Sequence, residues 1–262
     1  MTTVAKRIAP AAPIHLNAIS DVMLDLYRRQ LADDPEPYLI EHAEPRRVAH
    51  QARVFRWYAP YLPPDGAILD LGCAHGPDAC MLRKVFGERF ELHGCDFWPN
   101  DKFRIFREFS GMRYAKLTTN LALPYLDETF DVVVASGVLE HAAMDYELLK
   151  EIYRILKPDA KLIVSYLPNR FSREEWVSRN VRQAGFHRRL YGIGETMQLL
   201  KRTGFFPIVP VRHQSFAWEK RLENVVFSQR WIARFSGILR FLFPVHVLSS
   251  TLCGITQKVQ SM

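Results

Sequence analysis

Apolar side chains in the first sixty residues recur at spacings of three and four, a period that predicts amphipathic helices. The first predicted helix covers residues 14–31, with an apolar face of Leu16, Ile19, Met23, Leu26 and Tyr27. A Pro- and Asp-rich break follows, and a second helix is predicted from Pro45 to Tyr58. We interpret residues 1–60 as an N-terminal helical extension or cap.

From residue 67 onwards, short apolar runs alternate with helical periodicity. The predicted strands are 67–72, 90–96, 112–117, 130–136, 161–167, 206–211 and 251–259. The predicted helices are 77–86, 101–109, 146–156 with Asp145 as its cap, and a last one within 195–205 that ends at Gly204. Alternation of this kind predicts a doubly wound α/β sheet with right-handed crossovers, here within residues 61–262.

A glycine-rich turn, DLGCAHG, ends the first predicted strand, and Pro77 opens the helix behind it. Open parallel sheets bind ligands at the carboxyl ends of their strands, so this turn is a candidate site. A dinucleotide fingerprint would place glycines where the chain has Ala74 and Pro77. Pro77 lacks a helix N-terminal amide and the Cβ of Ala74 crowds the approach, which disfavours a pyrophosphate ligand.

Two stretches resemble the class I S-adenosylmethionine-dependent methyltransferases. The turn matches the D-x-G-x-G-x-G loop of that family, through Asp70, Gly72, Ala74 (for the middle Gly) and Gly76. Residues 121–169 resemble, nearly end to end, the family stretch that runs from LPF-x-D through VLEH and LKPGG to PN. The motifs are far more specific together than a lone glycine turn.

The resemblance covers about residues 66–211 and, more loosely, the final strand. It departs from the family at Asp159-Ala160, in place of a Gly-Gly surface turn, and at Thr119-Asn120, where many members are acidic. It implies a Rossmann-like sheet, mostly parallel with an antiparallel last strand. This interpretation includes two insertions: a lid-like one, 168–193, and an amphipathic helical one, 212–248, before the last strand.

The resemblance also implies a binding site for S-adenosyl-L-methionine. Its cofactor-binding residues would be Asp70, Gly72, Ala74 and Gly76 of the loop, Asp96 at the ribose, Phe97 and Trp98 flanking the adenine, Asn120 and Leu121 at the adenine amino group, and Ser136 and Gly137 facing the methyl group. A strand-end cap is the alternative for Asp96 alone, and core packing is the alternative for Phe97 and Trp98.

His141, in the LEH motif, stands where a general base could reach a hydroxyl acceptor, because the pKa of histidine lies near working pH. A helix-capping role is the alternative. No metal is expected, since Cys73, Cys80, Cys95 and Cys253 show no C-x-x-C spacing and suggest neither a zinc site nor disulfides. A reducing cytoplasm is the natural setting.

The basic residues are unevenly spread. Residues 170–262 hold 15 of the 35 Lys and Arg residues but only 5 of the 28 Asp and Glu residues. This fits contact with an anionic surface or substrate, and solvated arginine faces are the alternative. The insertion 168–193 would bring cationic and hydrogen-bonding side chains over the site: Arg170, Arg173, His187, Arg188, Arg189 and Tyr191.

Residues 229–243, QRWIARFSGILRFLF, combine a broad Trp/Phe/Leu/Ile face with arginines on the other face. Interfacial helices have this pattern, so we hypothesise peripheral contact with the inner membrane face, with a helix packed on the sheet as the alternative. The N-terminus has no apolar signal-peptide region and no stretch reaches the ~18 apolar residues of a membrane span. A cytoplasmic location is therefore expected.

The predicted function is S-adenosylmethionine-dependent methyl transfer to a small-molecule, glycan- or lipid-linked acceptor at a hydroxyl. No Asn/Asp-Pro-Pro-Tyr segment follows the strand 130–136, which disfavours the exocyclic amine of a nucleic-acid base. No specific nucleic-acid partner is expected. A protein or RNA acceptor, or an inactive cofactor-binding scaffold, remains the alternative.

Overall fold

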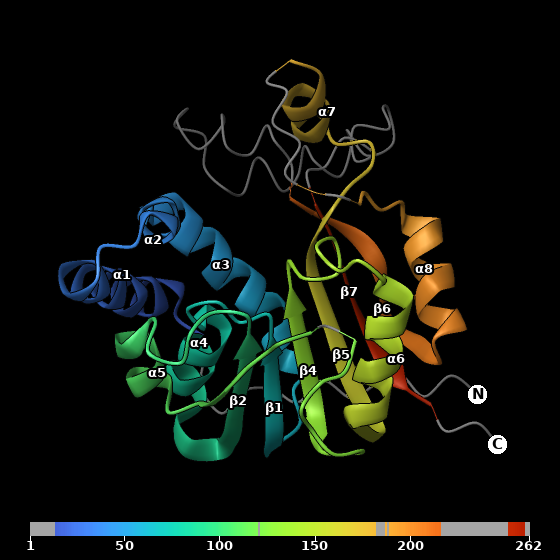
Figure 1. Cartoon of the computed structure of the whole chain (residues 1–262), viewed down its shortest axis with the longest axis horizontal. Helices are drawn as coiled ribbons and strands as arrows, with labels where there is room; N and C mark the ends of the chain where they lie inside the picture. The colour runs from blue at the N-terminus through green and yellow to red at the C-terminus, as the bar shows by residue number, and fades with distance from the viewer. Residues whose placement is uncertain (1–13, 120, 182–186, 188, 216–250, 260–262) are drawn as a thin grey trace.

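A seven-stranded sheet forms the centre of the protein (Figure 1). The computed structural model describes residues 14–119, 121–181, 187, 189–215 and 251–259. The strands are β1 (Gly66–Leu71), β2 (Phe90–Asp96), β3 (Arg113–Lys116), β4 (Phe130–Ser136), β5 (Leu156–Pro168), β6 (Phe205–Ser215) and β7 (Thr251–Lys258). All seven predicted strands are therefore present.

The strand order is β3-β2-β1-β4-β5-β7-β6. Strands β1 to β5 pair in parallel, and β7 runs antiparallel to both of its neighbours, β5 and β6. This confirms the predicted Rossmann-like sheet with an antiparallel last strand. The order reverses between β1 and β4. Open α/β sheets bind ligands outside the carboxyl ends of their strands at such a point.

Helices cover both faces of the sheet (Figure 1). They are α1 (Leu16–Asp33), α2 (Pro37–His42), α3 (Pro45–Tyr58), α4 (Pro77–Phe86), α5 (Arg104–Ser110), α6 (Asp145–Ile155), α7 (Arg173–Asn180) and α8 (Ile193–Arg202). Helices α1 to α5 share one buried apolar cluster with one sheet face, while α6 and α8 share a second cluster with the other. The alternating side chains of β4 supply both clusters, because successive strand residues face opposite ways.

The N-terminal helices pack on α4 and α5. In α1, the Tyr27 ring meets the Phe106 ring at 5.1 Å between centroids, and Gln30 Oε1 accepts a hydrogen bond from the Ile105 amide at 3.0 Å. Arg104 also forms an ion pair with Asp33 at 3.0 Å. These contacts hold α1 against α5, and the ring of Tyr38 in α2 meets the ring of His75, in the glycine turn that precedes α4, at 5.8 Å between centroids.

Two local predictions differ from the structure. The Pro- and Asp-rich break contains the helix α2, whose six residues are too few for a periodic pattern to reveal. Asp145 is not the cap of α6, because Met144 holds that position and Asp145 is the first helical residue. Its carboxylate is engaged by the lid-like segment 168–193, pairing with Arg189 and accepting from Tyr191 Oη at 3.2 Å.

The predicted amphipathic segment 229–243 lies outside the described residues. None of the helices that the structure describes combines the length and apolar character needed to cross a membrane. Helix α7 belongs to the segment 168–193 and lies beyond the carboxyl ends of the parallel strands (Figure 1).

Candidate active site

The glycine turn after β1 crosses the end of β2. The amides of Gly72 and Cys73 both donate to the carbonyl oxygen of Cys95, at 2.8 and 3.1 Å. Gly72 has a φ of +64°, and a Cβ at this position would lie 2.7 Å from Val138 Cγ2, so glycine is required. Gly76 ends the turn at φ +81° and gives way to Pro77, the first residue of α4.

Asp96 ends β2 and holds the turn in place. Its Oδ2 accepts from the Ala74 amide at 2.7 Å and its Oδ1 from the Phe97 amide at 2.6 Å. Ala74 has a φ of +46°, a left-handed conformation that costs a residue with a Cβ about 1–2 kcal/mol. An ionised carboxylate offers about four acceptor positions. The residue expected at the ribose therefore lies at the turn, with acceptor positions left for a ligand.

Two buried carboxyl groups lie behind the turn. Asp70 is 3% exposed and its Oδ2 accepts from the Ala79 amide at 3.3 Å, while Asp78 accepts from Tyr58 Oη at 2.5 Å. Burial, and then the negative charge of Asp78, raises the pKa of Asp70 well above its usual range, and burial also raises the pKa of Asp78. Sequence reasoning identified Asp70 and missed Asp78 and Tyr58, because nothing in the motif indicates that α3 reaches α4.

A cluster of rings closes the turn from the side of α1 and α2. His75, inside the turn, is 1% exposed, and its Nε2 lies 2.7 Å from Tyr27 Oη. Its ring also meets those of Tyr38, at 5.8 Å, and Phe103, at 5.9 Å between centroids. Burial lowers the pKa of His75 well below its usual range, so the imidazole is neutral. The motif treats position 75 as variable and gave no signal for this contact.

The residues expected at the adenine differ in their exposure and in their packing contacts. Phe97 is 53% exposed, whereas Trp98 packs against Phe103 with ring centroids 5.1 Å apart. Leu121 is exposed and its amide donates to Thr119 Oγ1 at 3.1 Å. Asn120 lies outside the described residues.

Ser136 and Gly137 lie where β4 ends, facing the turn after β1. Ser136 Oγ accepts from Ser165 Oγ at 2.9 Å, and the Gly137 amide donates to the Ser165 carbonyl oxygen at 3.0 Å. Gly137 has a φ of +69°, and a Cβ there would lie 3.5 Å from Glu140 Oε1. Glu140 therefore packs directly beside the end of β4.

His141 stands in a cluster of four titratable side chains. Its ring centroid is 5.5 Å from that of His187, whose Nδ1 lies 2.7 Å from Glu175 Oε1 in α7. Burial, and then the charge of His187, lowers the pKa of His141, which favours the neutral imidazole. Burial raises the pKa of Glu140 to about 8. Sequence reasoning placed His187 only in the lid and did not single out Glu140, although it lies in the LEH motif.

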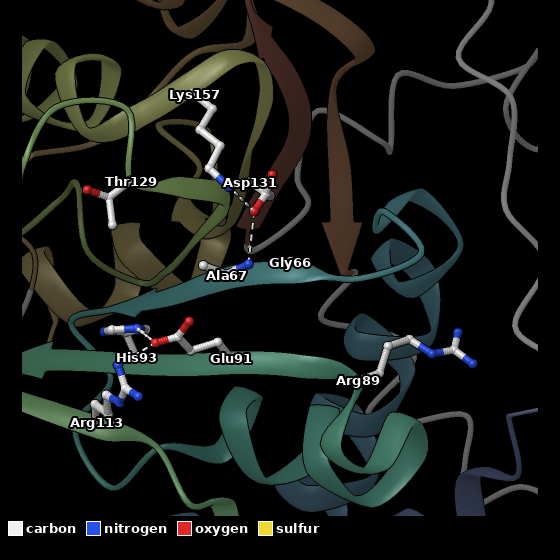
Figure 2. A pocket seen from close by; sticks show the side chains of 9 residues that line it. All are labelled: Gly66, Ala67, Arg89, Glu91, His93, Arg113, Thr129, Asp131 and Lys157. Carbon is white, nitrogen blue, oxygen red and sulfur yellow. Dashed lines mark hydrogen bonds and ion pairs between the residues drawn. The ribbon is translucent and has the colours of Figure 1, made fainter.

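A hollow of about 550 Å³ lies at the opposite edge of the sheet, where the strands begin (Figure 2). Its carboxylates are paired: Asp131 Oδ2 accepts from Lys157 Nζ at 2.8 Å and from the Ala67 amide at 2.9 Å. Glu91 likewise pairs with Arg113, and with His93 at 3.1 Å. Ligands of open parallel sheets bind at the other edge, so this hollow is not the candidate site.

Comparison with known proteins identifies the same family as the sequence motifs. Residues 40–208 match the family described as a methyltransferase domain. A demethylmenaquinone methyltransferase of Lactobacillus johnsonii is 32% identical over 99 residues, which cover 36% of this chain and 41% of that protein. The ubiquinone/menaquinone biosynthesis C-methyltransferase UbiE of Haemophilus ducreyi is 29% identical over 103 residues, covering 37% and 39%. The chain thus matches less than half the length of these curated relatives.

Solved structures share the fold. A SAM-dependent methyltransferase from Archaeoglobus fulgidus superposes with a TM-score of 0.62 at 19% identity, over 85% of this chain and all of that one (100%). Phosphoethanolamine N-methyltransferase 2 of Haemonchus contortus, solved with S-adenosyl-L-methionine, gives a TM-score of 0.56 at 21% identity, over 80% of this chain and 52% of that one.

Proposed function

The chain belongs to the methyltransferase-domain family, and we propose that it transfers a methyl group from S-adenosyl-L-methionine to the hydroxyl of a small-molecule, glycan- or lipid-linked acceptor. The observation that carries the proposal is the meeting of the Gly72–Gly76 turn with Asp70 and Asp96 at the point where the strand order reverses.

The residues at this point fit the cofactor. S-adenosylmethionine supplies an electrophilic methyl group on a positively charged sulfur, and it also carries an ammonium group. Buried carboxyl groups with raised pKa values, such as Asp70, gain a favourable partner when a cation arrives, because the opposite charge stabilises the ionised form. Asp96, at the adjacent strand end, retains acceptor positions for ribose hydroxyls. The turn has no need of the amide that Pro77 lacks, since the ligand has no phosphate.

The proposed methyl-transfer position is the end of β4, at Ser136 and Gly137. His141 follows these residues in a tight turn, in which its amide donates to the Val138 carbonyl oxygen at 3.0 Å. We assign His141 to the removal of the acceptor's proton, because its lowered pKa keeps the imidazole available at neutral pH. The remaining catalytic task of the protein is to position the two reactants and exclude water.

Two considerations support a small or lipid-linked acceptor over a protein or RNA. Two relatives named above are, by name, a demethylmenaquinone methyltransferase and a C-methyltransferase of ubiquinone and menaquinone biosynthesis. The basic excess lies in residues 170–262, which include the amphipathic segment 229–243. Docking of that segment on an anionic membrane face would present a lipid-linked acceptor to the site. Vesicle co-sedimentation tests this part: binding should require anionic lipid and weaken with salt.

Calorimetry tests the cofactor directly. S-adenosylmethionine and its demethylated product should both bind, and NAD should not compete with either. Tight binding of NAD with no response to S-adenosylmethionine would overturn the proposal. The acceptor is then sought by mass spectrometry, by comparing extracts of cells with and without the gene for a compound that differs by one methylene.

A further inference from the structure

Three potential metal ligands converge beside the end of β4. Glu140, His141 and His187 each offer one ligand atom, and these atoms all lie within 4.8 Å of one another. Two of them come from the turn after β4, and the third comes from the lid-like segment. Within the described residues this is the one group of three His, Cys, Asp or Glu side chains with such spacing.

Glu140 gives the independent reason to expect a ligand here. Its side chain is 2% exposed, yet its Oε2 has no hydrogen-bond partner among the described residues. A buried carboxylate oxygen without a partner is costly, and native structures rarely leave one. A cation held among the three side chains would supply that partner.

His187 is already oriented as a ligand. Its Nδ1 lies 2.7 Å from Glu175 Oε1. In the tautomer that donates from Nδ1 to this carboxylate, the lone pair is on Nε2 and is available to a metal ion. Metal-bound histidines characteristically donate their other ring N–H to a carboxylate in this way. Arg179 forms an ion pair with Glu175, with its Nε 3.7 Å from Glu175 Oε2.

We propose that Glu140, His141 and His187 bind a divalent first-row transition-metal ion, with Zn²⁺ the best match. Two imidazoles and one carboxylate form the ligand set of catalytic zinc sites, which keep a further position open. Ligand atoms around tetrahedral zinc lie about 3.4 Å apart, given Zn–N and Zn–O bonds of about 2.1 Å. Small rotations of the side chains are therefore enough to close the site.

The location gives the ion a task that rests on the proposed function. Glu140 Oε1 lies against Gly137, the residue proposed to face the methyl group. A divalent ion at this point would bind the acceptor oxygen through its open position and lower the pKa of the hydroxyl, whose proton passes to solvent. His141 would then promote loss of the acceptor's proton through the ion that it binds, and the acceptor class would be one with an exposed metal-binding oxygen.

The test uses the full chain without a polyhistidine tag, stripped with a chelator. Zn²⁺ is titrated by calorimetry, Co²⁺ by its visible absorption, and bound metal is counted by mass spectrometry. The variants are His187→Ala, Glu140→Gln and Glu175→Gln. His93→Gln is the matched control, because His93 also pairs with a glutamate, Glu91, but at the opposite edge of the sheet.

We expect one ion per chain in the wild type and in the His93 variant. Loss of the outer carboxylate in Glu175→Gln should weaken binding by roughly 10–100-fold, and loss of a ligand in His187→Ala or Glu140→Gln should weaken it further. His187→Ala keeps the test valid if Glu140→Gln melts early. Acetohydroxamic acid, a simple oxygen-donor probe, should shift the Co²⁺ band.

A wild type that binds no ion, or a His93 variant that loses as much binding as the His187 variant, overturns the site. An unshifted Co²⁺ band overturns its role toward the acceptor. Calorimetry of the same samples with S-adenosylmethionine separates the two proposals. Cofactor binding without zinc binding refutes the metal site alone, and zinc binding without cofactor binding refutes the proposed function.

Discussion

The two edges of the parallel sheet treat their acidic residues in opposite ways. Where the strands begin, Asp131 lies between Lys157 and the Ala67 amide, and Glu91 pairs with both Arg113 and His93 (Figure 2). Where the strands end, Asp70, Asp78 and Glu140 are buried, and burial raises the pKa values of all three. The negative charges of neighbouring acids raise the pKa values of Asp70 and Glu140 further.

The backbone does not distinguish the two edges, because residues with positive φ stand at both. Gly72, Ala74 and Gly76 lie where β1 ends, with φ between +46° and +81°, whereas Gly111 (φ +63°) and Glu128 (φ +51°) stand just before β3 and β4 begin. Buried acids with raised pKa values, by contrast, are found here only at the carboxyl edge among the acids compared above, and such groups cluster at functional sites. The contrast teaches that the ligand site is marked by the cost of burying its acids.

The largest expected effect is on catalysis at the carboxyl edge. His141→Ala should lower turnover by about 10²–10⁴, because the acceptor's proton loses its assistance, while the affinity for S-adenosylmethionine stays near the wild-type value. His93→Gln, the histidine of the opposite edge, should leave both unchanged. Single-turnover rates and calorimetry measure the two quantities. An unchanged rate in the His141 variant would assign that residue a structural role.

Asp96 tests cofactor binding. Asp96→Ala should weaken S-adenosylmethionine binding by roughly 1.5–3 kcal/mol, the range for hydrogen bonds to a charged group. The variant also frees the Ala74 amide, so the turn itself should loosen. Glu91→Ala, which removes a carboxylate from the start of the same strand, is the control and should bind the cofactor normally. Equal affinities for the two variants would remove Asp96 from the cofactor site.

The raised pKa of Asp70 predicts a pH dependence of binding. In the free protein Asp70 keeps its proton above the usual carboxyl range, and a cationic ligand favours the ionised form. Affinity for S-adenosylmethionine should therefore rise with pH through that window, by at most about tenfold per pH unit for one released proton, and level off above the pKa of the folded state. The demethylated product, which lacks the sulfonium charge, should depend less on pH.

Calorimetry in buffers of different ionisation enthalpy measures the released proton. Asp70→Asn is the matched variant, since it keeps the shape of the side chain and cannot titrate. A pH dependence that persists in Asp70→Asn would assign the proton to another group.

The fold was accessible from the sequence because its signals are local. Prolines at the first helical position placed α3 and α4 at the predicted bounds, Pro45–Tyr58 and Pro77–Phe86. The same signal stands at Pro37, but α2 has only six residues, too few for a helical period in the apolar positions to be recognised. The cap of α6 failed for a tertiary reason, since Arg189 and Tyr191 engage Asp145.

The site residues show the same distinction between local sequence signals and tertiary contacts. Asp70, the turn and Asp96 lie in short motifs, so the sequence alone brought them together. The partners that shape their chemistry come from afar: Tyr58 reaches Asp78 from α3, Tyr27 reaches His75 from α1, and His187 reaches His141 from the lid. No linear pattern encodes these approaches, because they depend on how helices and insertions pack on the sheet.

A smaller effect is expected at the amino edge. Asp131→Asn removes the ion pair with Lys157, whose side chains are 27% and 42% exposed. Exposed pairs of this kind contribute about 0–1 kcal/mol to stability. The free energy of unfolding should therefore decrease by about 0–1 kcal/mol in the variant, while the affinity for S-adenosylmethionine stays constant. Chemical denaturation measures the first quantity. A change in S-adenosylmethionine affinity would show instead that the two edges are coupled.

The smallest effect is expected at Ala74, where the family loop has glycine and this chain does not. Ala74→Gly removes a Cβ from a φ of +46°, which should recover about 1–2 kcal/mol of strain. The added freedom of the unfolded chain opposes this by about 0.4–1 kcal/mol, so the net gain in unfolding free energy should be around 1 kcal/mol or less. Thermal melting of the ligand-free protein measures it. If Asp96 instead holds the turn so firmly that strain is negligible, Ala74→Gly should destabilise the protein, because only the entropic term would remain.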